Sequence, residues 1–257
     1  MKKARIITIA NQKGGVGKTT TVMNLAHALT KQGKKVLVVD SDPQANLTSY
    51  LNAQPNHTLD ELYLAKKLLG PAHLGAFITP TPSGVSIIAC DSGLSGVEYY
   101  LFSRPQRETI LAGYLEMLAP DFDFILIDTP PSINLLTVNA LTACDEVLIP
   151  VQPEFFSLEG LVKIQETVED VRTRWNPRLQ IGGVLITQAN QRRKLTQEVV
   201  KSLKKDLGTI VFDTIIREGS AISESSGHGK SVLDYAPKSA GAIDYFHFSQ
   251  EVLNQTH

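Results

Sequence analysis

The chain has little cysteine and tryptophan: its 257 residues include two cysteines and one tryptophan. Cys90 and Cys144 show no Cys-x-x-Cys spacing and have no histidine cluster near them. The sequence therefore gives no sign of a disulfide framework or of a zinc site. Both thiols are expected to be buried in a reducing compartment.

The sequence also lacks an excess of one charge and a long apolar run. Its 25 basic and 26 acidic residues give a formal net charge of −1. A polyanionic partner is therefore not indicated by the total, and any basic surface must be local. No stretch approaches the roughly 18 apolar residues that span a bilayer, and the first apolar run, of about five residues, is too short for a signal peptide. These absences predict a soluble, cytoplasmic protein.

What the sequence does contain is a regular alternation of short apolar runs and helical patterns. A hydrophobic share of 42% is enough for one large core. The expected strands are 5–10, 35–40, 85–90, 122–128, 146–151, 181–187 and 209–212. The expected helices are 19–32, 59–69, 105–118, 133–143, 158–175, 195–207 and 240–253. Thr58 and Glu61 have capping-box spacing at the start of the second helix. This alternation predicts an α/β fold, a single-domain twisted, mostly parallel sheet with helices on both faces.

The most informative segment is Lys13-Gly14-Gly15-Val16-Gly17-Lys18-Thr19-Thr20, which follows an apolar run and precedes a helical pattern. A strand, a glycine-rich turn and a helix start form the geometry that wraps a polyphosphate. The glycines let backbone N–H groups approach the phosphates, and the helix adds the positive end of its dipole. Lys18 is expected at the β- and γ-phosphates and the Thr19 hydroxyl at Mg²⁺. Without the flanking strand and helix, the segment would be only a glycine-rich turn.

Two further expected strands end in carboxylates. One ends at Asp40 and continues as Ser41-Asp42-Pro43-Gln44-Ala45-Asn46; the other ends at Asp128 and continues as Thr129-Pro130-Pro131-Ser132. Parallel strands bring their C-terminal ends to one edge of a sheet, so these carboxylates are expected beside the glycine-rich loop. Asp128 has the Walker B arrangement and is expected to hold Mg²⁺ through water. Asp40 is expected near the metal and Asp42 at the attacking water, although an acidic turn capping a strand would have the same sequence.

The glycine-rich segment departs from the usual P-loop formula. Gln12 occupies the first glycine position, and a second lysine, Lys13, precedes the glycines. In this the chain resembles the deviant Walker A motif of the ParA/MinD family, the SIMIBI-class P-loop ATPases. The two acidic segments resemble that family's DxDPQ and DTPPS signatures, with Asp42 and Asp128 at matching positions. Similar segments extend over nearly the whole chain, at 94–98, 147–152, 155–160 and 228–230.

The resemblance is closer to ParA than to MinD, and it implies a specific organisation. Residues 1–257 are expected to form one ParA-like ATPase domain, without the N-terminal helix-turn-helix domain of larger relatives. The implied cofactors are ATP and Mg²⁺. The implied active form is a homodimer with ATP sandwiched at the interface, in which Lys13 of each copy touches the ATP of the other.

The same resemblance assigns roles to individual residues. The catalytic residues implied are Lys13, Lys18 and Asp42. The metal contacts implied are Thr19, Asp40 and Asp128. The nucleotide-binding residues implied are Lys13, Gly14, Gly15, Val16, Gly17, Lys18, Thr19, Thr20 and Asn190.

A basic stretch follows the expected strand that ends at residue 187. In the helix expected over 195–207, apolar residues recur every four positions and predict a buried stripe of Leu195, Val199, Leu203 and Leu207. Three lysines fall within about 40° of one another on the opposite side, Lys194, Lys201 and Lys205. Alone, this ridge would be an ordinary solvated helix face. In a ParA-like dimer, two such ridges would bind the backbone of double-stranded DNA without reading its bases. The expected DNA contacts are Arg192, Arg193, Lys201, Lys204 and Lys205.

One position departs from the ParA pattern. Many chromosomal relatives have a DNA-binding arginine where this chain has Ala221. Arg217 is the nearby arginine, and the sequence leaves open whether it replaces that contact or lines the nucleotide pocket.

Two other functions remain as alternatives. A MinD-like membrane-associated regulator would need a C-terminal amphipathic helix with a basic face, yet no Lys or Arg follows Lys238. An iron–sulfur carrier or reductase ATPase would need cysteines near the dimer axis, after the segments that follow Asp40 and Asp128, whereas Cys144 lies well beyond Asp128 in an apolar pattern.

The expected function is therefore that of a ParA-type ATPase. It would position plasmid, chromosome or another large cargo over the nucleoid, without contacting the membrane. Hydrolysis of ATP would be slow until a ParB-like partner or cargo adaptor stimulates it.

Overall fold

The computed structural model describes residues 3–154 and 157–255, which are organised around one eight-stranded sheet. The strands are β1 (Arg5–Ile9), β2 (Val36–Asp40), β3 (Ile78–Pro80), β4 (Ser86–Ile88), β5 (Phe124–Asp128), β6 (Glu146–Val151), β7 (Gln180–Ala189) and β8 (Val211–Arg217). They are ordered β3-β4-β2-β5-β1-β6-β7-β8. Every neighbouring pair is parallel except the short antiparallel pair β3–β4 at one edge.

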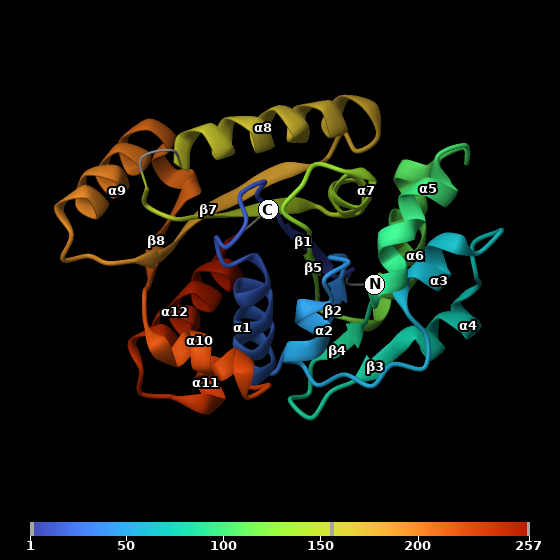
Figure 1. Ribbon diagram of the computed structural model, residues 1–257, viewed down its shortest axis with the longest axis horizontal. Helices are drawn as coiled ribbons and strands as arrows, with labels where there is room; N and C mark the ends of the chain where they lie inside the picture. The colour runs from blue at the N-terminus through green and yellow to red at the C-terminus, as the bar shows by residue number, and fades with distance from the viewer. Residues whose placement is uncertain (1–2, 155–156, 256–257) are drawn as a thin grey trace.

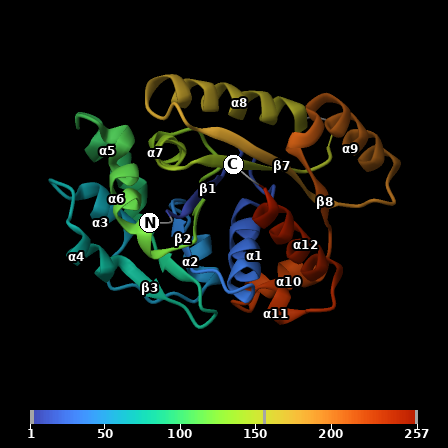
Figure 2. The ribbon, with the colours of Figure 1, turned by 180° about the vertical axis from the view of Figure 1, so that it is seen from behind.

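Helices cover both faces of this sheet, as Figures 1 and 2 show from opposite sides. The helices are α1 (Lys18–Lys31), α2 (Asn46–Tyr50), α3 (Leu59–Leu64), α4 (Pro71–Leu74), α5 (Val97–Leu101), α6 (Ile110–Leu118), α7 (Leu135–Ala143), α8 (Ser157–Arg174), α9 (Lys194–Leu207), α10 (Ser220–Gly227), α11 (Val232–Tyr235) and α12 (Ala240–Asn254). Helices α7 and α8 lie on one side of the sheet, and α1 and α12 on the other.

Each face of the sheet has its own hydrophobic core, because successive side chains of a strand point to opposite faces. Ile6 of β1 belongs to the core under α6, α7 and α8, whereas Ile7 belongs to the core under α1 and α12. Val39 and Val38 of β2 divide between the two cores in the same way. Burial on both faces explains why these strands are continuous apolar runs. The fold class predicted from the sequence is confirmed.

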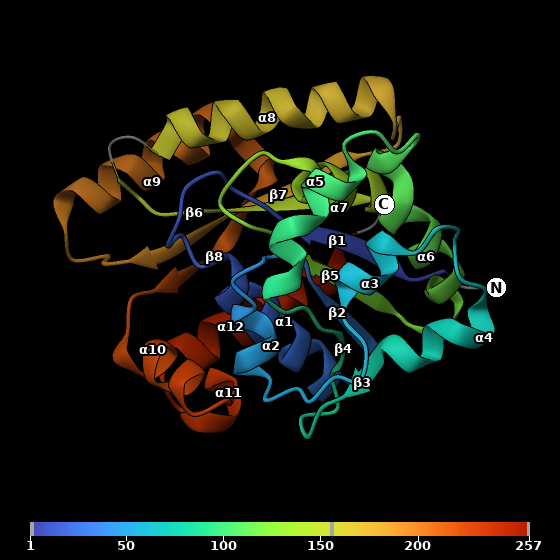
Figure 3. The same ribbon diagram turned by 45° about the vertical axis from the view of Figure 1, so that its right-hand side comes forward.

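Strand β1 is central, between β5 and β6, so the loop that follows it lies in the middle of the C-terminal edge of the sheet. Figure 3 shows this edge, with the loop rising from β1 and turning back into α1. The ends of β2 and β5 lie on one side of the loop, and the ends of β6 and β7 on the other. This arrangement brings residues that are far apart in sequence to one place.

Several predicted boundaries are wrong. The helix expected over 59–69 ends at Leu64, because the backbone at Ala65 is extended, and Gly70 instead precedes a separate short helix with Pro71 in its first turn. Its predicted start is correct: the Thr58 N–H donates to the Glu61 carboxylate at 3.1 Å. The strand expected over 209–212 runs from Val211 to Arg217, since residues 208–210 form a 3-10 turn.

Other elements were not expected from the sequence. Strand β3 and helices α2, α10 and α11 are short, so their sequences contain too few residues to show a clear hydrophobic period. The family-like segment at 155–160 begins at residues outside the described ranges. No helix in the described part of the chain combines the length and apolar character needed to cross a bilayer.

Candidate functional site

The loop between β1 and α1 has the backbone of a phosphate cradle. Gly15 and Gly17 adopt φ angles of 75° and 86°, in the left-handed region that side chains disfavour. Helix α1 begins directly after Gly17; no side chain caps this end, and the first turn contains no acidic residue. The backbone N–H groups at the start of α1 are therefore available to an anion, and the helix dipole favours one there.

Lys18 lies at the base of this loop with only 7% of its surface exposed. Its ammonium donates to the Lys13 carbonyl at 3.3 Å. Burial lowers the pKa of the Lys18 ammonium, while the charges of Asp128 and Asp42 raise it. A buried ammonium can bind a polyphosphate, and a metal ion bound to that polyphosphate can offset the charges of the two carboxylates nearby.

Asp128 and Asp40 are direct neighbours across the β5–β2 pair, and both are fully buried. One Asp128 oxygen accepts the Thr129 N–H at 3.1 Å, whereas the other, Oδ2, has no hydrogen-bond partner among the described residues. Burial, and then the charge of Asp40, raises the pKa of the Asp128 carboxyl well above its usual range. A buried carboxylate oxygen without a donor fits a cation ligand.

The carboxylate of Asp40 is engaged differently. Its Oδ2 accepts the Thr48 N–H at 2.8 Å and the Thr48 hydroxyl at 2.7 Å, and its Oδ1 accepts the Asp42 N–H at 3.3 Å. Burial raises the pKa of Asp40 to about 6 against these hydrogen bonds. Asp40 thus holds the turn that contains Asp42. Because the oxygens of Asp40 already accept hydrogen bonds and Asp128 Oδ2 accepts none from the described residues, Asp128 is the better candidate for a metal contact.

The cofactors of this fold, ATP and Mg²⁺, fit these residues. Gly14–Thr20 would hold the phosphates, and Thr19 and Asp128 would hold Mg²⁺, which withdraws charge from the phosphate oxygens when bound. No group of three or more His, Cys, Asp or Glu residues within 3–154 and 157–255 forms a metal cage. A magnesium ion bound mainly through phosphates needs no such cage.

Asp42 lies at the start of the turn after β2, which the Ala45 N–H closes by donating to the Asp42 carbonyl at 2.8 Å, and is 6% exposed. One of its carboxylate oxygens accepts the Gln44 N–H at 3.0 Å. Its backbone carbonyl accepts a hydrogen bond from the Cys90 thiol at 3.1 Å. These contacts hold the Asp42 carboxylate at the site edge near Lys18, where a carboxylate can orient a water molecule.

Lys13 extends from the rim of the loop rather than into the cradle. Its ammonium forms an ion pair with the Glu154 carboxylate, and the two side chains are 39% and 58% exposed. The Lys13 N–H donates to the Asn11 side chain at 3.0 Å. Lys13 and Lys18 therefore occupy different environments, one accessible from outside the chain and the other buried.

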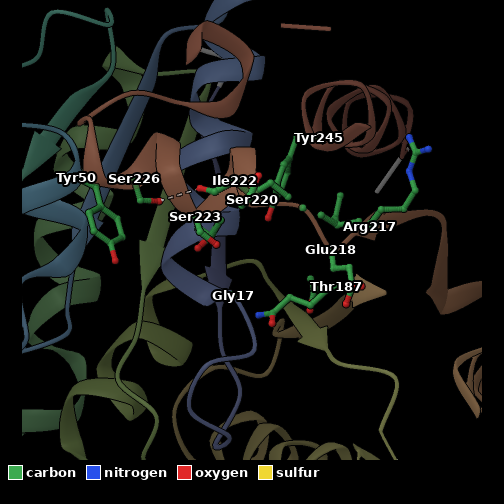
Figure 4. A pocket seen from close by; sticks show the side chains of 14 residues that line it. Gly17, Tyr50, Thr187, Arg217, Glu218, Ser220, Ile222, Ser223, Ser226 and Tyr245 are labelled. Carbon is green, nitrogen blue, oxygen red and sulfur yellow. Dashed lines mark hydrogen bonds between the residues drawn. The ribbon is translucent and has the colours of Figure 1, made fainter. Parts of the chain in front are cut away.

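A cavity of about 630 Å³ opens beside the start of α1. Figure 4 shows it between Gly17 on one side and Thr187 and Glu218 on the other, with Tyr50, Ser223 and Tyr245 also on its wall. It lies next to Thr20 and is large enough for a nucleoside. A nucleotide with its phosphates on the loop would place its base and sugar here.

Arg217, whose role the sequence left open, and Asn190, predicted to bind the nucleotide, lie near this cavity. Arg217 lines it, but its guanidinium pairs with the Asp244 carboxylate through two contacts of 2.9 and 2.6 Å. Asn190 donates to the Glu218 carboxylate, which lines the cavity, and accepts the Arg192 N–H at 3.1 Å. Arg217 is therefore held by Asp244 at the cavity wall, and Asn190 contacts that wall through Glu218, so its role as a nucleotide-binding residue stays a prediction.

The predicted basic residues gather at α9 and the loop before it, at one end of the molecule in Figure 1. Arg192, Arg193, Lys201 and Lys205 are exposed. Lys204 is half-buried and pairs with Asp213 at 3.2 Å. Lys194 lies 3.9 Å from Glu198 and is almost fully exposed.

The buried stripe predicted for α9 is partly wrong. Leu203 is fully buried, and Val199 and Leu207 pack against the core. Leu195 is instead 51% exposed, and Thr196 is buried in its place. The first turn of α9 therefore presents a different side to the sheet from the one that the four-residue spacing predicted.

Sequence reasoning missed the side chains of Gln152, Thr187 and Gln188, which contact the glycine-rich loop from the ends of β6 and β7. Their position was detectable, since the expected strands ended at residues 151 and 187 and the C-terminal ends of parallel strands carry binding residues.

Comparison with known proteins agrees with this geometry. A protein-family model described as an AAA domain matches residues 4–181. The chain is 41% identical over 253 residues to the chromosome partitioning protein ParA of Caulobacter vibrioides, covering 98% of this chain and 94% of that protein.

Solved structures give the same result. A structure described as cobyrinic acid a,c-diamide synthase from Mycobacterium smegmatis, with bound ATP analogue and magnesium, has a TM-score of 0.83 and 34% identity, covering 97% of this chain and 94% of that one. The cell division ATPase MinD of Pyrococcus furiosus has a TM-score of 0.79 and 26% identity, covering 97% and 98%. These three proteins have different cellular roles by their names, so the likeness alone does not give the cellular role of this chain.

Proposed function

The chain belongs to the ParA/MinD family of P-loop ATPases, and from that premise we propose that it is a ParA-type partition ATPase. In this proposal two copies associate around ATP, and the dimer binds double-stranded DNA without sequence preference. Hydrolysis, stimulated by a ParB-like partner or cargo adaptor, releases it. The location that follows is the nucleoid, and the cargo is a plasmid, chromosome or other large assembly.

The observation that carries the DNA part is the accessible basic group of Arg192, Arg193, Lys201 and Lys205 on one end of the molecule, hereafter the basic corner. The chain as a whole has a formal net charge of −1, so this concentration is a local feature. Exposed lysines and arginines bind DNA by neutralising phosphates and releasing counterions. A dimer would present two basic corners and so double the number of contacts.

The membrane-bound alternative has less support. Helix α12 contains no lysine or arginine, and its buried side chains, including Tyr245, Phe248 and Val252, pack against the core under α1. A helix that binds anionic lipid through an apolar face needs that face free and flanked by basic residues. Helix α9, by contrast, contains four lysines, Lys194, Lys201, Lys204 and Lys205.

We expect the DNA contacts to dominate affinity. Lys201→Glu combined with Lys205→Glu should abolish retardation of duplex DNA by the ATP-bound protein, while ATP-dependent dimerisation persists. For the unmodified protein, affinity should fall steeply with salt; if these lysines contact phosphates in both copies, they account for a log–log slope of about four. Gel retardation over a salt series, with duplexes of unrelated sequence, measures both quantities.

The matched control reverses the same number of charges elsewhere: Lys66→Glu with Lys67→Glu changes two exposed lysines after α3. This variant should lose only the small part of its DNA affinity that depends on the net charge of the protein. Equal losses in both double variants would show that the basic corner has no special role. Binding of the ATP form to anionic vesicles without DNA retardation would favour the MinD-like function.

The proposed dimer gives Lys13 a role distinct from that of Lys18. Lys13→Ala should leave ATP affinity nearly unchanged, because its ammonium lies outside the cradle of its own copy. ATP-dependent dimerisation and turnover should be lost. Calorimetry measures the first quantity, and light scattering with a slowly hydrolysed ATP analogue measures the second.

Glu154→Ala is the control, since it breaks the same ion pair from the other side and leaves the lysine in place. It should still dimerise. A Lys13→Ala protein that dimerises and turns over normally would reduce Lys13 to a surface lysine of the loop.

A further inference from the structure

The glycine-rich loop is held from outside by three side chains, one directly after β6 and two near the end of β7. The Gln188 amide donates to the Gly15 carbonyl at 2.6 Å, and the Gln152 amide donates to the same oxygen at 3.1 Å. The Thr187 hydroxyl donates to the Val16 carbonyl at 2.8 Å. Two successive carbonyls of the loop are therefore anchored to the same side, towards the ends of β6 and β7.

Anchoring a carbonyl also aims the next amide. In a trans peptide the C=O of one residue and the N–H of the following residue point in opposite directions. The Gly15 carbonyl therefore fixes the Val16 N–H, and the Val16 carbonyl fixes the Gly17 N–H. Both amides point away from the anchoring side chains, and within 3–154 and 157–255 neither donates a hydrogen bond to another group.

The anchoring group is itself held in place. Gln152 donates to the Gln188 side-chain oxygen at 2.7 Å, so the two amides orient one another. The Thr187 side chain is buried at 1% exposure. Gln188 adopts a φ of 52°, in the left-handed region, where the pairing of β7 with β8 shifts register. Such strained, irregular positions persist near functional sites when they aim a side chain.

We propose that Gln152, Thr187 and Gln188 are positioning residues for ATP, which aim the Val16 and Gly17 amides at its phosphates. They act through the backbone of the loop. The inference rests on the assignment of Gly14–Thr20 to the phosphates. Glycines make that loop flexible, so carbonyl anchors supply the preorganisation that the glycines themselves cannot.

The test separates phosphate binding from nucleoside binding. Thr187→Val removes the hydroxyl at nearly constant volume, and we expect about tenfold weaker binding of Mg·ATP, the scale of lost outer-shell partners in metal sites. Because Thr187 also lines the nucleoside cavity, the loss is read as the ratio of Mg·ATP affinity to adenosine affinity, and this ratio should fall about tenfold. Thr187→Ser, which keeps the hydroxyl, should restore the affinity for Mg·ATP. Titration calorimetry with Mg·ATP and with adenosine measures all three values.

Gln188→Gly distinguishes positioning from a contribution to folding alone. Glycine tolerates the left-handed backbone, so this variant should unfold at the same temperature as the unmodified protein or a higher one. Its affinity for Mg·ATP should nevertheless fall about tenfold. Gln152→Ala should behave like Gln188→Gly in binding, and Gln180→Ala, at the exposed opposite end of β7, should bind like the unmodified protein.

The possible outcomes test the positioning role of the three side chains separately from the assignment of Gly14–Thr20 to the phosphates. If the unmodified protein binds adenosine and Mg·ATP equally well, the phosphate assignment is wrong, and the positioning role falls with it. If the unmodified protein prefers Mg·ATP and the three variants keep that preference in full, only the positioning role is wrong. Parallel losses of adenosine and Mg·ATP binding would likewise overturn it, in favour of general damage to the fold.

Discussion

Lys18→Ala is expected to weaken Mg·ATP binding about 100-fold, equivalent to about 2.8 kcal/mol. The variant deletes a buried ammonium that lies under the Lys13 carbonyl with the carboxylates of Asp128 and Asp42 near it. Without this cation, the negative phosphates would meet those carboxylates with less compensation. Calorimetric titration measures the loss, and the proposed ATP-dependent dimerisation should fail in parallel.

The control for this prediction is Lys31→Ala, at the other end of the same helix. Lys31 pairs with Asp234 at 2.6 Å on the surface, so its loss removes one lysine from α1 without touching the loop. Its affinity for Mg·ATP should match that of the unmodified protein. Tight Mg·ATP binding by a folded Lys18→Ala protein would overturn the phosphate-loop assignment.

Asp42→Ala is expected to reduce single-turnover hydrolysis about 10²–10⁴-fold, the usual contribution of a positioned proton acceptor. Binding of Mg·ATP should persist, because Asp42 lies at the edge of the site rather than in the cradle. The protein would then accumulate as an ATP-bound dimer that stays on DNA. Quenched hydrolysis of labelled ATP, with binding measured separately, distinguishes the two effects.

Two further variants separate the chemistry of Asp42 from the shape of its turn. Asp42→Asn keeps an oxygen that can accept the Gln44 N–H but removes the charge, so it should hydrolyse as slowly as the alanine variant. Asp91→Ala removes the same kind of contact elsewhere, a carboxylate that accepts the N–H two residues ahead at 2.7 Å. It should hydrolyse normally. Wild-type turnover in Asp42→Asn would leave Asp42 with a structural role only.

The features predictable from sequence were those encoded over a few consecutive residues. The run ending at Ile9, the glycines after it and Lys18 are adjacent in the chain, so strand, loop and helix follow from local pattern. The neighbouring positions of Asp40 and Asp128 also followed, because parallel strands meet at one edge.

The rest depended on tertiary placement. Glu154 as the partner of Lys13, and Gln188 as a donor to Gly15, join residues 141 and 173 positions apart. Glutamine and glutamate side chains at strand ends are common, and nothing local marks these as contacts of the loop. The exposure of Leu195 was missed for the same reason: helical spacing gives the relative direction of side chains but not which side meets the sheet.

The ion pair between Lys13 and Glu154 has a consequence for how ionic strength acts on the proposed cycle. If Lys13 moves to the ATP of a second copy, one pairing of opposite charges is exchanged for another, and few small ions are taken up or released. DNA binding at the basic corner instead displaces many condensed cations. Rising salt should therefore dissociate the protein from DNA while the ATP-bound dimer survives, so the two steps of the cycle can be observed one at a time.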